Sequence, residues 1–137
     1  MEIILAENHG FCYGVKRAVE MANEAADSDG KSYTLGPIIH NPQVVGRLES
    51  KGVSPIQEVS DIDEGTMIIR SHGVGPAIYE EAEEKGLNIL DATCPHVKKA
   101  QQDAKSVIED GMTLVILGEK NHPEVKSINL WANNKGI

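Results

Sequence analysis

Short, unbroken runs of apolar residues are the feature that most constrains what this chain can fold into. They occupy residues 3–5, 67–69, 87–90 and 114–117, and a weaker run covers 32–35. Each run is continuous rather than alternating in polarity, which is typical of strands covered on both faces. We therefore expect strands near 2–6, 66–70, 87–92 and 113–118.

A helical pattern follows each run, with apolar residues on one face over 15–25, 44–48, 78–82, 97–108 and 125–131. Four of these patterns are followed by a glycine, where a helix stop belongs: Gly30, Gly52, Gly86 and Gly111. Asn41 and Cys94 each precede a proline, as an N-cap precedes the first helical residue. Repeated strand–helix units predict an α/β fold with a mainly parallel sheet.

Composition narrows the class of partner. The 137 residues carry a net charge of −8 and no basic block, which argues against nucleic acid as a partner. No apolar run reaches the ~18 residues of a membrane span, and the first residues lack the basic start of a signal peptide. We expect a cytoplasmic protein without a membrane partner. A small anionic ligand stays open, because local groups hold such a ligand.

Each expected turn between a strand and the next helix contains a cysteine or a histidine. In chain order these residues are Cys12, His40, His72, Cys94 and His122. Ligands of open α/β sheets bind outside the carboxyl ends of the strands. The five side chains are therefore expected at one rim of the sheet.

The two cysteines are candidate metal ligands. Gly10 and Gly14 flank Cys12 and allow the backbone to approach a bulky group, and a helix N-terminus with Lys16 favours the thiolate. Cys94 also lies at an expected helix N-terminus. Two thiolates from separate turns suit one iron–sulfur cluster or one zinc ion, although a buried cysteine is often an inert apolar residue.

Two further motifs indicate anion binding. Gly73 and Gly75 follow His72 in a turn that resembles a phosphate-binding loop before a helix. It lacks the third glycine of a dinucleotide fingerprint. His122 and Glu124 place an imidazole and a carboxylate two residues apart, a pairing that suits anion binding beside proton transfer.

Taken together, these motifs resemble the 4-hydroxy-3-methylbut-2-enyl diphosphate reductases, the LytB-type family. The resemblance covers essentially the whole chain, and the order and spacing of its segments make it specific. The matching segments are Gly10-Phe11-Cys12-Tyr13-Gly14-Val15-Lys16-Arg17-Ala18, Gly36-Pro37-Ile38-Ile39-His40-Asn41, Arg70-Ser71-His72-Gly73-Val74, Asp91-Ala92-Thr93-Cys94-Pro95, and Gly118 followed by His122-Pro123-Glu124-Val125.

The resemblance implies a three-lobed α/β fold around a four-iron–four-sulfur cluster, with one cysteine from each lobe. Cys12 and Cys94 match two of these ligands. His40, His72 and His122 match the histidines around the substrate diphosphate, and Glu124 matches the carboxylate implicated in proton delivery. The implied reaction is a two-electron reduction that removes the allylic hydroxyl as water and forms isopentenyl and dimethylallyl diphosphates. An electron donor such as ferredoxin or flavodoxin is implied as a partner.

The chain also departs from the family pattern. It has no third cysteine, lacks the later threonine and Ser-x-Asn segments of the pocket, and is about half the family's length. We expect a first lobe with an N-terminal strand over 1–95, the beginning of a second lobe over 96–137, a truncated end, and no activity of the chain alone. His9 and His96 have no counterpart in the family pattern and are interpreted as incidental.

Two alternatives stay open from the residues themselves. The chain could be a zinc or dithiol module that uses Cys12, Cys94 and a histidine. It could instead be a non-catalytic diphosphate-binding domain whose cysteines are inert.

Overall fold

The computed structural model describes residues 2–7, 9–28 and 30–137. Its centre is a four-stranded parallel sheet in the order β2-β1-β3-β4. The elements follow the chain as α1 (Tyr13–Ala26), β1 (Ser32–Leu35), α2 (Pro42–Ser50), β2 (Val53–Ile56), η1 (Val59–Asp61), β3 (Thr66–Ile69), α3 (Pro76–Glu84), β4 (Asn88–Asp91), α4 (Pro95–Glu109) and α5 (Pro123–Trp131). The α/β class with a parallel sheet is confirmed.

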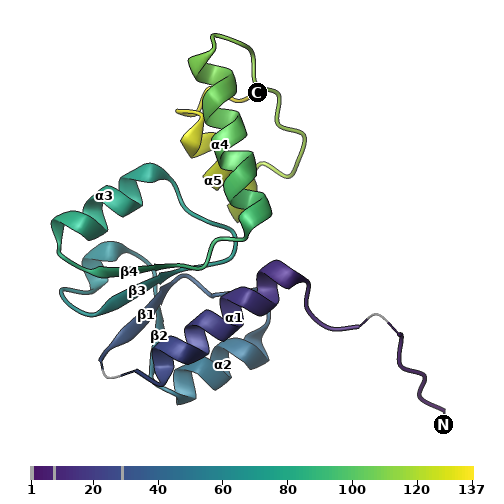
Figure 1. The fold of residues 1–137 in the computed structure, drawn as a ribbon, viewed down its shortest axis with the longest axis vertical. Helices are drawn as coiled ribbons and strands as arrows, with labels where there is room; N and C mark the ends of the chain where they lie inside the picture. The colour runs from purple at the N-terminus through teal and green to yellow at the C-terminus, as the bar shows by residue number, and fades with distance from the viewer. Residues whose placement is uncertain (1, 8, 29) are drawn as a thin grey trace.

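Helices cover both faces of the sheet (Figure 1). Successive side chains of β3 alternate between the two sides, as strand geometry requires. Ile68 packs in a core with α1 and α2, whereas Met67 and Ile69 pack in a second core on the α3 side. All three side chains are fully buried, which explains why this strand reads as an unbroken apolar run.

The helix boundaries follow the expected local chemistry. Asn41 is the N-cap of α2, and its side-chain oxygen accepts hydrogen bonds of 3.1 Å from the N–H groups of Gln43 and Val44. Past α3, Gly86 adopts a positive φ of 69°, and the next N–H, of Leu87, returns to the carbonyl of Ala82 at 3.0 Å. This is the glycine-terminated helix end that the sequence predicts.

The strand β2 is absent from the apolar runs that predict the other strands of the sheet. This strand is short and polar in part, and it contains Pro55. Proline cannot donate a ladder hydrogen bond, so it is tolerated at the edge of a sheet, where β2 lies.

The strand expected at residues 2–6 is a wrong prediction. Residues 2–7 form neither a strand nor a helix, and they extend away from the rest of the molecule (Figure 1). The side chains of Ile3, Ile4 and Leu5 are 74%, 83% and 75% exposed. A strand needs a hydrogen-bonded neighbour, and among the described residues this segment has none.

The strand expected at 113–118 is also not formed as such. The segment is extended, and its only ladder-like bonds in the described part of the chain involve Ile137. The N–H of Ile137 donates to Leu114 at 3.1 Å, and the N–H of Ile116 donates to Ile137 at 2.8 Å. Ile137 thus bonds to two residues, Leu114 and Ile116, that lie two positions apart, as in a parallel pair of strands. The pairing involves only this one residue of the partner segment.

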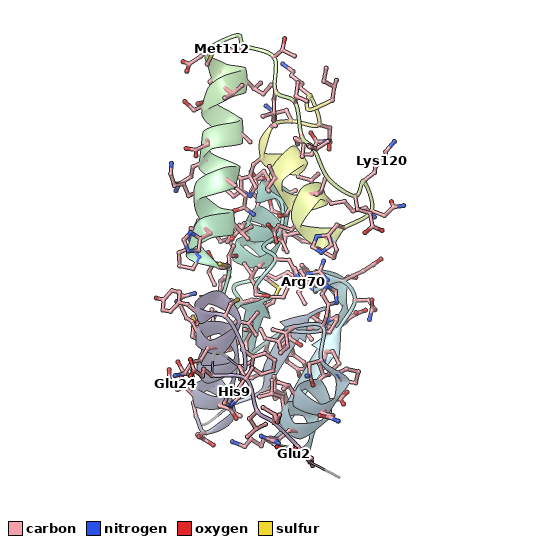
Figure 2. The ribbon with its side chains drawn as sticks, turned by 90° about the vertical axis from the view of Figure 1, so that its right-hand side faces the viewer. Glu2, His9, Glu24, Arg70, Met112 and Lys120 are labelled. Carbon is pink, nitrogen blue, oxygen red and sulfur yellow. The ribbon has the colours of Figure 1, made fainter. Side chains whose placement is uncertain are left out.

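The helices α4 and α5 pack on each other beyond the carboxyl ends of the strands (Figure 1). In Figure 2, Arg70 lies between the sheet and these two helices, while Met112 lies at the far end of α4. The division into lobes at residues 95 and 96 stays a prediction. Within the described residues, no helix is long and apolar enough to cross a membrane.

The contrast between β3 and the N-terminal segment can be tested with a matched pair of variants. Ile68→Ala removes a fully buried side chain and should lower the free energy of unfolding by about 2–5 kcal/mol. Ile4→Ala removes an exposed side chain and should change the free energy of unfolding by less than about 0.5 kcal/mol. Urea denaturation followed by circular dichroism measures both values. Equal losses would show that the segment at 2–6 is packed like a core strand.

Candidate functional site

The site lies at the point where the strand order reverses. From β1 the chain moves to the edge strand β2, and β3 then adds on the other side of β1. The loops that leave β1 and β3 diverge there, and ligands of open α/β sheets bind in such crevices. His40 is on the loop that follows β1, and His72 is on the loop that follows β3.

Three histidine rings meet at this crevice. The ring centroids of His40 and His72 are 4.5 Å apart, those of His72 and His122 5.7 Å, and those of His40 and His122 6.1 Å. One ring nitrogen from each histidine lies within 4.8 Å of the other two. His40 is exposed and the other two are partly buried, so the cluster opens to solvent on one side.

Backbone hydrogen bonds join the loops that carry these groups. The N–H of Ser71 donates to the carbonyl of Ile38 at 3.4 Å, and its hydroxyl donates to the same oxygen at 3.3 Å. The N–H of Cys94 in turn donates to the carbonyl of Ser71 at 2.9 Å. These hydrogen bonds connect the His40, His72 and Cys94 loops into one unit. Ile38 and Ser71, which make them, are both buried.

Both cysteines are helix N-caps with free thiols. Cys12 precedes α1, Cys94 precedes α4, and neither side chain makes a capping hydrogen bond. A Cβ built at Gly14 would lie 2.5 Å from the sulfur of Cys94, so the absence of a side chain there makes room for the thiol. Cys94 therefore lies against the first turn of α1, next to the segment that carries Cys12.

The same junction is held by Arg17 of α1. Its guanidinium donates to the carbonyls of Thr93 and Asp91 at 3.3 and 3.5 Å. The carboxylate of Asp91 accepts from the N–H of Thr93 at 3.0 Å and pairs with Lys98 at 2.6 Å. These contacts lower the pKa of Asp91 despite the opposing effect of burial. The Cys94 loop is thereby tied to both α1 and α4.

Buried polar contacts attach α5 to the His72 loop. The hydroxyl of Ser127 lies 2.8 Å from the carbonyl of His72 and 2.9 Å from that of Glu124, and Gln101 of α4 donates to it at 3.3 Å. The indole N–H of Trp131 donates to the carbonyl of Val74 at 2.8 Å. These bonds bring the N-terminus of α5, with His122, to the other two histidines.

Gly73 and Gly75 allow this close approach. A Cβ at Gly75 would lie 2.8 Å from two carbons of Leu130, and a Cβ at Gly73 would collide with the amide of Gln101. Gly73 also has a positive φ of 71°, which side chains rarely adopt. The two glycines therefore allow side chains of α4 and α5 to pack directly against the backbone of this loop.

The electrostatics of the cluster keep His72 neutral near pH 7. Burial lowers its pKa from 6.5 to about 4, and the nearby charges of His40, Arg70 and His122 act in the same direction. The Nδ1 atom of His72 is buried without a hydrogen-bond partner in the described part of the chain.

His122 has a defined tautomer. Its Nδ1 accepts a hydrogen bond of 3.2 Å from the N–H of Glu124, so the neutral ring carries its proton on Nε2. The ring can therefore donate through Nε2.

The cavity beside the histidines has a volume of about 220 Å³ and reaches the segment before α1. It is lined by Phe11, Val15, Ile39, His40, Asn41, Ser71 and His72. A larger cavity of about 510 Å³ lies between α5 and residues 116–121. Neither a cysteine nor a histidine lines it, so we place the candidate site at the smaller one.

The structure brings together His40, His72 and His122, and it places Cys94 beside the first turn of α1. Glu124 lies in the first turn of α5, partly buried. His9 and His96 are exposed and lie outside the three-histidine group. The expectation that each of the five side chains follows a strand of the sheet is wrong for two of them, because Cys12 and His122 do not follow paired strands. They reach the site as N-caps of α1 and α5.

Sequence reasoning missed the residues that hold the site together, namely Arg17, Ser71, Gln101, Ser127 and Trp131. One signal was available for Gln101. It occupies the buried face of α4 between Val97 and Ala104, and a polar residue at such a position needs a partner. The partner itself, Ser127, could not be identified from the helical pattern.

The family model described as LytB protein matches residues 3–137. A 4-hydroxy-3-methylbut-2-enyl diphosphate reductase from Geotalea uraniireducens is 55% identical over 135 residues, which cover 98% of this chain and 48% of the relative. The corresponding protein from Geobacter sulfurreducens is 54% identical over 132 residues, covering 96% and 47%. The chain thus spans about half the length of the curated relatives it matches.

Solved structures give the same result. A structure described as (E)-4-hydroxy-3-methyl-but-2-enyl diphosphate reductase, the terminal enzyme of the non-mevalonate pathway, matches with a TM-score of 0.84 and 50% identity, over 98% of this chain and 49% of that one. The reductase from Plasmodium falciparum matches with a TM-score of 0.91 and 32% identity, over 96% and 42%.

The low pKa of His72 predicts how stability depends on pH. Between pH 6.5 and about 4 the unfolded chain binds a proton at this imidazole and the folded chain does not, so stability should fall as the pH falls through this interval. His72→Gln should flatten that part of the profile, whereas His96→Gln should leave it unchanged. Urea midpoints at pH steps measure the slopes. Identical slopes for wild type and His72→Gln would contradict the assignment.

Proposed function

The chain belongs to the LytB protein family, and on that basis we propose that it supplies the diphosphate-binding histidines, two cluster cysteines and the proton-donating carboxylate of a 4-hydroxy-3-methylbut-2-enyl diphosphate reductase. The observation that carries this proposal is the convergence of His40, His72 and His122 at the strand-order reversal. The His72 loop is hydrogen-bonded to Cys94, the N-cap of α4, and the thiol of Cys94 lies against Gly14 in the first turn of α1, the helix that Cys12 caps.

The histidines bind the diphosphate as hydrogen-bond donors in this proposal. His122 offers the N–H of Nε2, because its Nδ1 already accepts from Glu124. His72 is neutral in the free protein, and an incoming diphosphate favours its protonated form by supplying negative charge. Binding is therefore accompanied by proton uptake. This explains how a chain of net charge −8 can hold a polyanion without a basic surface.

Cys12 and Cys94 are the proposed ligands of a four-iron–four-sulfur cluster. Both thiols are free and stand at helix N-termini, whose partial positive charge favours thiolates, and Gly14 leaves space beside Cys94. The chain fits as the source of two ligands, since it has two cysteines. When bound, the cluster supplies the electrons for the reduction.

Glu124 is the proposed proton donor. The reaction exchanges the allylic C–O bond for a C–H bond, consumes two electrons and two protons, and releases the hydroxyl oxygen as water. The carboxyl group of Glu124, in the first turn of α5, lies two residues after the diphosphate-binding His122 in the chain, where it can deliver a proton to the departing oxygen. The products are isopentenyl and dimethylallyl diphosphates. The electrons come from a donor protein such as ferredoxin or flavodoxin.

Diphosphate binding provides the first test. His72→Ala should weaken the binding of inorganic diphosphate by about 1–2 kcal/mol, the value of one charge-assisted hydrogen bond. His40→Ala and His122→Ala should act in the same direction, and His96→Ala serves as the matched control. Isothermal titration calorimetry measures the affinities. Unchanged affinity in all three cluster variants would remove the histidines from the diphosphate site.

Turnover provides the second test. A chimera carries residues 1–137 in place of the matching half of the Geotalea uraniireducens reductase, and is reconstituted anaerobically with iron and sulfide. It should reduce the allylic diphosphate, whereas residues 1–137 alone should not. Glu124→Gln should lower turnover by about 10²–10⁴-fold with the iron content unchanged, because a positioned acid contributes a factor of this size. Cys12→Ser should reduce the iron content itself.

The controls for this assay are His9→Ala and His96→Ala, which should match the unmodified chimera. Robust turnover by residues 1–137 alone would refute the proposal that this chain supplies only part of the active site. An inactive chimera whose iron content is unaffected by Cys12→Ser would refute the reductase function. Stoichiometric zinc bound through both cysteines would favour the zinc module instead.

A further inference from the structure

Arg70 is a partly buried cation with no ion-pair partner among the described residues. It follows β3 directly, and desolvation lowers its pKa, which means that burial penalises its charge. Its Nε atom is buried and has no hydrogen-bond partner in the described part of the chain. A buried, charged donor left unsatisfied is costly and indicates a missing partner such as an ion.

The guanidinium lies above the backbone of Gly36. A Cβ built at Gly36 would lie 2.8 Å from Nη1 of Arg70, and Gly36 has a positive φ of 70°. The position therefore excludes a side chain that would cover the cation. Arg70 is thus left facing the space between the sheet and α5, where Figure 2 also places it.

A cavity of about 370 Å³ occupies this space. Arg70 and Lys126 line it together with polar Gln57 and Asn121, and with the glycines of the Gly73-Val74-Gly75 loop. It is distinct from the cavity beside the histidines, whose lining includes His40 and His72 but not Arg70.

Among the described residues, the lining of this cavity has two cations and no carboxylate, although the chain as a whole is acidic. Within the described residues, ion pairs engage Lys16, Lys31, Lys85, Lys98, Lys99 and Lys105, but neither Arg70 nor Lys126. Of the cations outside these ion pairs, Arg70 and Lys126 are the two that line this cavity.

We propose that the cavity between β3 and α5 is a second anion site, which binds the phosphoryl group of a small phosphate ester through Arg70 and Lys126. The planar guanidinium suits two oxygens of a phosphoryl group. The N-terminus of α3 begins at Gly75 on the same wall and adds its partial positive charge. This gives the Gly73-Val74-Gly75 loop a role in phosphate binding at this cavity.

The remaining lining predicts what is attached to the phosphoryl group. Leu35, Val74, Ile78 and Leu130 contribute apolar surface to the cavity. Its volume lies within the range of about 300–1,000 Å³ that is usual for small-molecule sites. The ligand is therefore an ester with a short apolar chain. An alkyl phosphate should bind at least about tenfold more tightly than inorganic phosphate, because burial of each methylene group is favourable.

The test follows the Nε–H signals of the three arginines in a ¹H–¹⁵N spectrum during titration with inorganic phosphate and then butyl phosphate. The Arg70 signal should shift and saturate. Those of Arg17, which is bonded to two carbonyls, and of exposed Arg47 should stay in place. Calorimetry on variants gives the affinities. Lys126→Ala should weaken phosphate binding about fivefold or more, and Arg70→Met about tenfold or more, with part of the loss recovered in Arg70→Lys.

Arg47→Met and Lys135→Ala are the matched controls and should keep the wild-type affinity. His40→Ala should change the phosphate affinity read at the Arg70 signal by less than about twofold while it weakens diphosphate binding, which separates the two anion sites. The proposal is overturned if the Arg70 signal does not move. It is equally overturned if Lys126→Ala has no effect, or if phosphate binding is lost in His40→Ala and kept in Arg70→Met. Butyl phosphate that binds no better than inorganic phosphate would refute the ester assignment.

Discussion

The contact of α4 and α5 with the loop that follows β3 is the interaction on which the rest of the site depends. The hydroxyl of Ser127 bonds to the carbonyl of His72, and the indole of Trp131 bonds to that of Val74. Gly73 and Gly75 let the side chains of both helices lie directly on the backbone. Without this contact, His122 and Glu124 would have no fixed position relative to the sheet, because β3 and α5 are far apart in the chain.

The contact also sets the charge of the site. It partly buries His72 among His40, His122 and Arg70, and this environment keeps its imidazole neutral in the free protein. Partial positive charge is then supplied by helix N-termini and oriented N–H groups instead of by a basic surface. In the proposed function, these local groups bind the anion although the chain has a net charge of −8. In the same proposal, binding of a diphosphate at this site is coupled to protonation of His72.

Much of this arrangement was predictable from sequence, and the exceptions have physical reasons. The helices and the strands β3 and β4 follow from apolar periodicity, and the site residues lie in turns whose position topology dictates. The strands expected near 2–6 and 113–118 failed because an apolar run specifies a strand only where a neighbour pairs with it. Ile4 and Leu117 instead stay exposed. The hydrogen bond between buried Gln101 and Ser127 could not be predicted, because the two residues are distant in sequence and meet only through helix packing.

We propose that three histidines from separate loops form one diphosphate site. It is tested most directly by following the imidazole ¹⁵N signals of all five histidines while inorganic diphosphate is added. The signals of His40, His72 and His122 should shift together with one dissociation constant, with His72 moving toward its protonated form, while those of His9 and His96 should stay in place. Shifts with different dissociation constants among the three, or a response of only one of them, would contradict a single diphosphate site.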